Sequence, residues 1–467
     1  MAKSKDGKKG GGRPWRENIE AITVSVIVIV LFKYFVLEAY KIPTGSMQPT
    51  LMGWDDGKGG GVFDRVIVDK LSYRFRDPER WEIAVFRYPL DSSKNFIKRI
   101  VGMPGEELKI EDGDLFTRRD ASEAWEILRK PRALQDTQLK ELEHQGQWNT
   151  SGGSWTQNQE GDLVVRGAGE ARFPRATSAV VDRYADGYPG RLAEVVRSKP
   201  AGSSRYRVGD LRLLCEVEPE ADCLQVRLEF LEGDWIYALE LPGPAAIEDT
   251  RARLSLTHAR DESLRRRLPL DGVTSLEAGE AVEVELRNVD DLLEVTVNGE
   301  LVASETLESI PQSDLIRSGV RLATEAGGAA FRELSIARDI YYTDDQKVTS
   351  WEIPDDSYVV LGDNTQDSSD SRDWMLIGFQ LPDGREVWGN QRTRENPLFS
   401  QGHPGGPQVF FRDQLGELHV FPNAQANPLP PRPNGLVPRE LIRGRAVLVV
   451  WPPYVPSYEV SRLKWCR

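Results

Sequence analysis

The chain has 467 residues, of which 39% are hydrophobic, 9% aromatic and 28% charged. This composition excludes a largely disordered or collagen-like chain, and the length predicts two or three domains. A formal net charge of −13 argues against a general nucleic-acid-binding protein, which needs a basic surface. Three cysteines are too few for a disulfide scaffold, and four histidines without a Cys/His cluster predict no metal site.

The N-terminus combines a basic stretch with an apolar one. Residues 1–16 carry six Lys or Arg and one acid, and residues 19–37 are mostly apolar, with only Glu20 and Lys33 charged, near the ends of the stretch. About 20 apolar residues cross a bilayer as a helix, and basic flanks stay cytoplasmic. We therefore expect a cytoplasmic tail over 1–16, a single transmembrane helix over 17–38 and the remaining chain beyond the membrane. A cleaved signal peptide is the alternative, but Leu37 stands where a cleavage site has a small residue.

Strand-forming segments follow the apolar stretch. Residues 63–68 alternate between apolar and polar side chains, whereas 82–86 and 96–101 are apolar and rich in β-branched residues. Residues 108–116 predict a hairpin that turns at Asp112-Gly113. The periodicity of residues 121–144 is helical apart from Pro131, so we expect a helical linker over 117–145.

The character of the chain changes over residues 146–340. Apolar residues alternate with polar ones at 224–230, 235–241, 282–286 and 293–297, and Asn298-Gly299 predicts a hairpin turn. Many half-buried strands with short turns predict an antiparallel β-sandwich, here of the jelly-roll kind. This stretch loosely resembles the concanavalin-like domains of lectins and sugar-processing proteins. Cys215 and Cys223 flank a short acidic turn and could pair, a question the sequence leaves open.

The last part returns to isolated strands. Residues 358–361 and 445–451 are apolar and predict strands, and residues 375–434 are rich in Pro, Gly, Asn and Gln, which predicts a surface insertion. The fold class we expect is mainly β. A catalytic core over 39–116 and 341–467 would then be interrupted by the sandwich.

Two residues suggest hydrolytic chemistry. Ser46 lies in a Pro-bounded segment directly after the predicted membrane helix, and Lys98 lies at the end of an apolar strand, where lysine is uncommon. A lysine acts as a general base only when it is neutral, and lowering its pKa to roughly 7 requires about 4–5 kcal/mol. Burial can supply a shift of that size. A Ser–Lys pair is a known variant of the Ser-His-Asp arrangement.

Five segments in order resemble the sequence boxes of bacterial type I signal peptidases, also called leader peptidases. They are residues 42–50 (IPTGSMQPT), 63–70 (FDRVIVDK), 80–105 with FIKRIVGMPG, 362–372 with GDN and DSR, and 435–446 with GLVP and RGRA. Phe63 and Trp81 stand where that family usually has glycine, and Glu82 where it usually has aspartate. The resemblance covers less than half of the chain, so the sandwich is interpreted as an insertion.

The resemblance implies a role for each matching residue. Ser46 would be the nucleophile and Lys98 its general base. The oxyanion hole would combine the Ser46 N–H with the Thr44 hydroxyl. Ser368 would orient Lys98. The residues that would support the site are Asp363, Asn364, Asp370 and Arg372.

The resemblance also implies a substrate. It would be the signal peptide of an exported precursor protein, cut after a small-x-small sequence by an enzyme of the bacterial cytoplasmic membrane. The residues that would line the substrate pockets are Ile42, Leu51, Phe96 and Ile97. No cofactor is implied, and the partners would be precursor proteins and membrane lipid, with no nucleic acid.

Two other functions stay open. The chain could be an anchored receptor that binds a glycan or protein through the sandwich, with the peptidase-like part as scaffold. Alternatively, the sandwich of an active enzyme could recruit precursors or bind a glycan of the cell envelope. Intact Ser46, Lys98, Thr44 and Ser368 favour an active enzyme.

Overall fold

The protein is mainly β in its described part. The computed structural model describes residues 14–55, 61–188, 191–197, 206–247, 250–270, 272–273, 275–344, 346–390, 398–400, 406–458 and 460–466. The predicted basic tail, residues 1–16, lies almost entirely outside these residues. The described strands form several antiparallel sheets, and only three α-helices accompany them.

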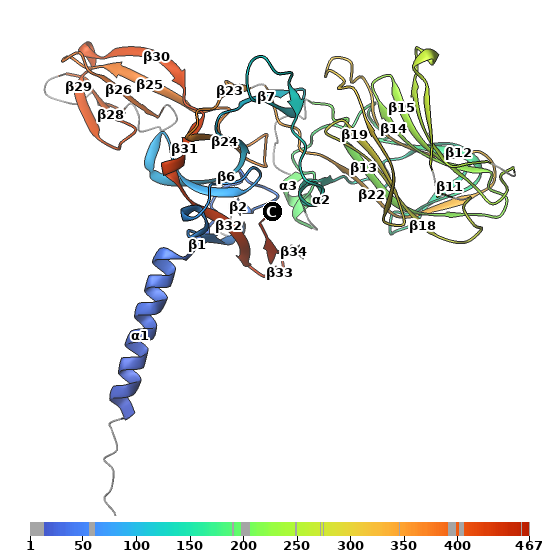
Figure 1. The fold of residues 1–467 in the computed structure, drawn as a ribbon, viewed down its shortest axis with the longest axis horizontal. Helices are drawn as coiled ribbons and strands as arrows, with labels where there is room; N and C mark the ends of the chain where they lie inside the picture. Colours follow the sequence, from blue (N-terminus) through green and yellow to red (C-terminus); the bar gives the residue numbers. More distant parts are fainter. Residues whose placement is uncertain are drawn as a thin grey trace, which may run out of the picture.

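A helix begins the described chain. Helix α1 (Pro14–Phe35) projects away from the other elements (Figure 1) and leads into β1 (Leu37–Lys41). Its apolar side chains are exposed, among them Ile22, Val28 and Ile29. Among the described residues, no helix reaches the length and hydropathy needed to cross a bilayer.

An eight-stranded sheet contains the segments that the sequence related to a peptidase. Its strands run in the order β1-β4-β32-β5-β6-β24-β31, and β35 pairs with β32. Their bounds are β4 (Arg65–Asp69), β5 (Ile83–Tyr88), β6 (Asp91–Gly102), β24 (Ser357–Leu361), β31 (Leu436–Pro438), β32 (Ile442–Trp451) and β35 (Lys464–Trp465). Two short ribbons accompany it, formed by β2 (Gly53–Asp55) with β3 (Gly61–Phe63) and by β33 (Tyr454–Val455) with β34 (Val460–Ser461).

A four-stranded sheet leads from this region to the rest of the chain. It consists of β23 (Ser350–Glu352), β7 (Glu107–Glu111), β8 (Asp114–Arg118) and β9 (Glu126–Ile127). The predicted hairpin is confirmed, because Asp112 and Gly113 adopt positive φ angles of 52° and 101° between β7 and β8. The structure corrects the helical prediction for 117–145, since only α2 (Arg132–Gln138) is helical and Pro131 starts it.

A thirteen-stranded antiparallel sheet occupies the sequence between β9 and β23. Its main order is β17-β16-β15-β14-β21-β12-β22-β13-β18-β19-β20, with β10 and β11 paired at β22 and β12. The strands are β10 (Lys140–Glu141), β11 (Asn149–Gln157), β12 (Leu163–Phe173), β13 (Leu211–Pro219), β14 (Gln225–Glu232), β15 (Trp235–Pro242), β16 (Arg253–His258), β17 (Arg266–Pro269), β18 (Val282–Val289), β19 (Leu292–Val297), β20 (Glu300–Thr306), β21 (Ser318–Thr324) and β22 (Ala329–Arg338).

This sheet curls around one core. Strand β12 pairs with β22 near its start and with β21 near its end, so it joins the two halves of the sheet. Side chains from both halves, such as Leu213 and Leu239, belong to the same buried cluster. Cys215 and Cys223 lie in this cluster as free thiols, so no disulfide joins them.

One segment between β12 and β13 packs against the two short ribbons that accompany the eight-stranded sheet. Helix α3 (Arg191–Arg197) lies between β12 and β13 in sequence, yet Figure 1 shows it outside the curled sheet, on the side that faces β2. Its Leu192 and Val196 share a buried cluster with Trp54 of β2 and Val460 of β34. The segment between β12 and β13 therefore contributes to the core next to the candidate active site.

The region 375–434, predicted as a surface insertion, forms two small β-sheets. It forms β25 (Met375–Gln380), β26 (Glu386–Asn390) and β30 (Asn427–Pro433) in one sheet, and β27 (Leu398–Ser400), β28 (Gln408–Arg412) and β29 (Leu418–Pro422) in another. Buried Phe379, Phe411 and Phe421 pack between these sheets. The composition hid this small core, because Pro and Gly dominate the turns that surround it.

Candidate active site

The candidate nucleophile lies in a turn that leaves β1. Ile42 N donates to Asp64 O at 2.9 Å, and Leu51 N donates to Met47 O at 2.7 Å, so both sides of the turn are held by the backbone. The buried Asp64 carboxylate accepts from Met52 N at 2.8 Å and pairs with Arg462 at 2.6 Å. The turn is thus fixed by residues that follow it closely and by the C-terminal segment.

The structure brings Ser46 and Lys98 together. Lys98 lies in the middle of β6 and its Nζ is 2.5 Å from Ser46 Oγ, with a second hydrogen bond to Ile97 O at 3.2 Å. The lysine is only 3% exposed, and the ring of Phe96 lies 5.6 Å from its ammonium. Burial lowers the pKa of Lys98 to about 8, although the Asp370 and Asp363 carboxylates oppose the shift.

Two buried ion pairs surround this amine. Arg99 forms a bidentate pair with Asp363 at 2.9 and 2.7 Å, and Arg372 forms one with Asp370 at 2.9 and 2.8 Å. Burial alone would raise the pKa of each carboxyl, but the arginines outweigh it and hold both pKa values below the ordinary value. Each carboxylate is therefore committed to a guanidinium and attracts the Lys98 ammonium less than a free one would.

Asn364 holds the nucleophile turn directly. Its side-chain Nδ2 donates to Gly45 O at 2.9 Å, and its backbone N–H donates to Ser46 O at 3.2 Å. The preceding Gly362 packs so closely that a Cβ there would lie 2.4 Å from Ser46 O and 2.1 Å from Ser368 Oγ. A side chain at position 362 would therefore displace the turn.

The predicted hydrogen bond between Ser368 and Lys98 does not form among the described residues. The Ser368 hydroxyl is buried without a hydrogen-bond partner of ordinary geometry, although it lies near enough to Asp370 to help lower the pKa of that carboxyl. Lys98 directs its hydrogen bonds to Ser46 and Ile97 instead. The orienting role of Ser368 stays a prediction.

The two expected oxyanion donors lie on the same turn. The Thr44 side chain is exposed, and within the described chain neither its hydroxyl nor the Ser46 N–H donates to another protein group. Two donors without protein acceptors, one on each side of Gly45, fit an anion that develops beside Ser46 Oγ.

The four predicted substrate contacts divide into two kinds. Ile42 and Leu51 are 2% and 0% exposed and belong to the core below the turn, together with Met47. Phe96 and Ile97 are half-buried, and Phe96 stacks on Tyr88 with ring centroids 4.2 Å apart. Surface for a peptide therefore comes from Phe96 and Ile97 far more than from the two core residues.

Trp81 occupies an unusual backbone conformation. Its φ is +73°, a backbone region that glycine adopts without strain and that other residues rarely adopt. Its carbonyl accepts from Arg99 Nη1 at 2.7 Å, and its backbone N–H donates to Ile100 O at 2.7 Å. The surrounding bonds, together with burial of the indole at 9% exposure, hold a conformation that is rare for a bulky residue.

Sequence reasoning missed the contribution of the inserted region. Tyr188 donates to Gln48 Oε1 at 2.6 Å, and Asn364 Nδ2 donates to Tyr184 Oη at 3.2 Å. Both tyrosines precede α3, about 140 residues from Ser46 in sequence. No periodicity or motif linked them to the nucleophile, and only the fold brings them to it.

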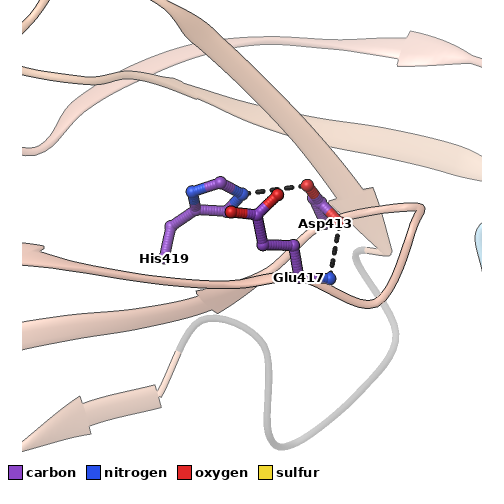
Figure 2. A group of neighbouring side chains, drawn as sticks. All are labelled: Asp413, Glu417 and His419. Atoms are coloured by element: carbon purple, nitrogen blue, oxygen red, sulfur yellow. Dashed lines mark hydrogen bonds and ion pairs between the residues drawn. The ribbon is translucent and has the colours of Figure 1, made fainter.

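Two other groups of side chains have metal-binding residue types. Asp413, Glu417 and His419 meet at the turn between β28 and β29 (Figure 2), where the Asp413 carboxylate caps backbone N–H groups and lies 2.9 Å from His419 Nε2. The second group is Asp114, Asp210 and Asp290. Neither touches Ser46 or Lys98.

Comparisons with known proteins identify the family of the chain. The model of the family described as signal peptidase, peptidase S26, matches residues 15–166 and 278–390. The chain therefore belongs to the signal peptidase S26 family. It is 42% identical over 108 residues to a probable signal peptidase I-2 of Synechocystis sp., which is 22% of this chain and 45% of that protein. It is 35% identical over 96 residues to signal peptidase I of Pseudomonas fluorescens, covering 18% of this chain and 31% of that one.

These matches are partial. The chain spans less than half the length of either relative. A carbohydrate-binding module, CBM66 from Bacillus subtilis, is similar in structure to part of this chain at a TM-score of 0.26 and 10% identity, covering 41% of this chain and 95% of that module. So low a score supports no conclusion about the curled sheet.

Proposed function

We propose that this protein is a signal peptidase I, a serine endopeptidase that removes signal peptides from exported precursor proteins. The observation that carries the proposal is the 2.5 Å contact between Ser46 Oγ and a Lys98 amine that is 3% exposed. A buried amine with a pKa of about 8 is neutral in a useful fraction of molecules near neutral pH. Family membership agrees with this chemistry.

The reaction would proceed by acyl transfer. Neutral Lys98 takes the Ser46 proton while Oγ attacks the scissile carbonyl, and the oxyanion accepts from the Ser46 N–H and the Thr44 hydroxyl. The Lys98 ammonium then gives its proton to the leaving amine, which releases the mature protein and leaves an ester on Ser46. Lys98 next takes a proton from water, the hydroxide attacks the ester, and the proton returns to Ser46 Oγ.

The supporting residues would keep the base functional. Asp363 and Asp370 stay paired with Arg99 and Arg372, so neither becomes a free counter-ion for the Lys98 ammonium. Ser368 would meet the amine once the serine proton has moved. Phe96 and Ile97 would line the cleft for a small-x-small peptide, with Ile42 and Leu51 supporting it from the core.

The catalytic part would comprise residues 39–116 and 341–467, and the jelly-roll sandwich over 146–340 would be inserted in it. Helix α1 would anchor this part to the cytoplasmic membrane of a bacterium, with residues 1–16 on the cytoplasmic side. The exposed Ile22, Val28 and Ile29 and the Lys- and Arg-rich tail support this placement. An anchor would hold the cleft near emerging precursors, which raises their effective concentration.

A cleavage assay with a purified precursor tests the proposal. Ser46→Ala removes the nucleophile and is expected to abolish cleavage, whereas Ser313→Ala, at an exposed serine of the inserted region, is expected to cleave like the parent. Mass spectrometry of the product locates the cut after a small-x-small sequence. Cleavage by Ser46→Ala at the parental rate would refute the serine mechanism.

A further inference from the structure

The inserted region reaches the nucleophile turn through two tyrosines. Tyr184 and Tyr188 lie in the connection between β12 and β13, and their rings stack with centroids 6.0 Å apart and planes 26° apart. Both side chains face the turn that carries Ser46, because their hydroxyls hydrogen-bond Asn364 and Gln48. A segment outside the peptidase-like sequence boxes thus completes the surroundings of the serine.

Tyr188 fixes the side chain that packs beneath the turn. Its hydroxyl donates to Gln48 Oε1 at 2.6 Å, and Gln48 is only 2% exposed. The Gln48 amide lies against Gly45, where an added Cβ would be 3.2 Å from Oε1. Since Gly45 immediately precedes Ser46, a shift of the Gln48 amide would move the peptide that carries the nucleophile.

The same peptide is held from the other side. Asn364 Nδ2 donates both to Gly45 O at 2.9 Å and to Tyr184 Oη at 3.2 Å. The two tyrosines therefore contact two different side chains that meet at Gly45. Such a clamp restricts the turn more than either contact alone, because both would have to break before the turn could shift.

The tyrosine segment is itself anchored. Gln366 Nε2 donates to Asp182 Oδ2 at 2.8 Å, and Arg338 of β22 pairs with Asp186 at 2.8 Å. Leu192 and Val196 of α3 pack against Trp54 in a buried cluster. The segment is thus connected at once to the curled sheet, to the loop after β24 and to β2.

We propose that Tyr188 is a positioning residue for catalysis, which acts through Gln48 to set the direction of Ser46 Oγ toward Lys98. The inference rests on the proposed function, since it requires Ser46 to be the nucleophile. Small misplacements of a reacting group lower the rate without weakening substrate binding. The inserted region would then contribute a residue that orients the nucleophile.

The test is steady-state cleavage of a precursor peptide by the full chain and three variants. Tyr188→Phe and Gln48→Met each remove one partner of the 2.6 Å hydrogen bond, and the third variant combines them. We expect kcat to fall about five-fold in Tyr188→Phe, the rate equivalent of one ordinary hydrogen bond, with KM unchanged. The double variant should be no slower than Gln48→Met, because both changes remove the same hydrogen bond between Tyr188 and Gln48.

A pH profile separates positioning from other effects. Tyr188 does not touch Lys98, so the acidic limb of kcat against pH should stay where it is in the parent. Tyr237→Phe is the matched control, since Tyr237 is a buried tyrosine of β15 that hydrogen-bonds Glu232 inside the inserted sheet. It should keep the parental kcat.

Several outcomes would overturn the inference. They are a parental kcat in Tyr188→Phe, multiplying losses in the double variant, or an equal loss in Tyr237→Phe. Should Tyr188→Phe not fold, Gln48→Met decides alone, and a parental kcat there overturns the inference. Failure of the proposed function looks different, because Ser46→Ala would then cleave as fast as the parent.

Discussion

Two buried lysines in different regions have pKa values that are shifted in opposite directions. Lys98 lies in the eight-stranded sheet and Lys130 where the linker meets the curled sheet, and they are 3% and 4% exposed. The pKa of Lys98 falls to about 8, mainly because of burial. Burial also acts to lower the pKa of Lys130, but the nearby Asp290 and Asp339 carboxylates outweigh it and raise that pKa well above the ordinary value.

The difference lies in what the neighbouring carboxylates bind. Near Lys98, Asp363 and Asp370 are each engaged by an arginine through two hydrogen bonds. Lys130 is itself the cation that pairs with Asp290 and Asp339, at 3.3 and 2.6 Å. The pKa of a buried lysine therefore falls where arginines neutralise the nearby acids, and rises where the lysine itself is the cation that pairs with them.

The two lysines affect folding over different pH ranges. Below pH 8 Lys98 is protonated in both the folded and the unfolded chain, so burial of the cation lowers the free energy of unfolding. This loss of stability disappears as the pH rises from about 8 to 10.5, because the folded chain then holds a neutral lysine. Lys130, with its raised pKa, stabilises the fold fully below pH 10.5 and loses this effect as the pH rises through its folded pKa.

The largest expected effect comes from Lys98→Met. Cleavage should fall about 10³-fold or more because the proposed general base is lost. The free energy of unfolding at pH 7 should nevertheless rise by about 2–3 kcal/mol, since a buried cation is replaced by an apolar side chain of similar size. Urea unfolding of parent and variant at pH 7 and pH 10.5 measures this gain, which should shrink at the higher pH. Lower stability at pH 7 would contradict the lowered pKa of Lys98.

Lys130→Met makes the opposite prediction. It leaves Asp290 and Asp339 buried without their cation, so the free energy of unfolding at pH 7 should fall by about 3–5 kcal/mol. Urea unfolding measures the loss. Lys109→Met, at a partly exposed lysine paired with Glu111, is the control and should change stability by roughly 0.5 kcal/mol or less. If Lys98→Met and Lys130→Met lost equal stability, the distinction between Lys98 and Lys130 would not hold.

The sequence predicted that Ser46 and Lys98 lie together, and the structure places their side chains in contact, but it did not predict every residue around them. Lys98 could be recognised because a lysine in an apolar strand conflicts with ordinary burial preferences, and Ser46 because its Pro-bounded segment resembles a signal peptidase box. Lys130 has the same unusual burial, yet its sequence neighbourhood looks like a polar linker. Its partners Asp290 and Asp339 lie about 160 and 209 residues away, and only the folded chain unites them.

The same limit applies to the fold. Alternating residues predicted the strands of the insertion well, because half-buried strands carry a period of two. The helical prediction for the linker over 117–145 was mostly wrong. Only Arg132–Gln138 is helical in this segment, and β9 pairs with β8. Nothing in the sequence singled out Tyr188, because a tyrosine before a short helix is common. Its role became visible only in the structure, where its hydroxyl lies 2.6 Å from Gln48 Oε1.

A smaller effect on Lys98 is expected from Arg372→Met. Without Arg372 the Asp370 carboxylate loses its counter-ion and attracts the Lys98 ammonium more strongly, which raises the pKa of the lysine. The acidic limb of kcat against pH should then move to higher pH by about one unit. Arg385→Met, at an exposed arginine paired with Asp383, should leave the limb unmoved. A limb that stays in place in Arg372→Met would show that the arginine does not tune the base.

The smallest expected effect concerns Asp114, beside the Lys130 cluster. Burial, together with Asp290 and Asp291, raises the pKa of Asp114 well above the ordinary value of 3.8. An acid with a raised pKa lowers folding stability once the pH exceeds its unfolded pKa, so Asp114→Asn should stabilise the protein by about 1 kcal/mol at pH 7 and by nothing near pH 3. Urea unfolding at both pH values measures the difference, with the exposed Asp355→Asn as control. Lys130 already pairs with Asp290 and Asp339. Destabilisation by Asp114→Asn at pH 7 would therefore mean that the Asp114 carboxylate is ionised and is also stabilised by the Lys130 ammonium.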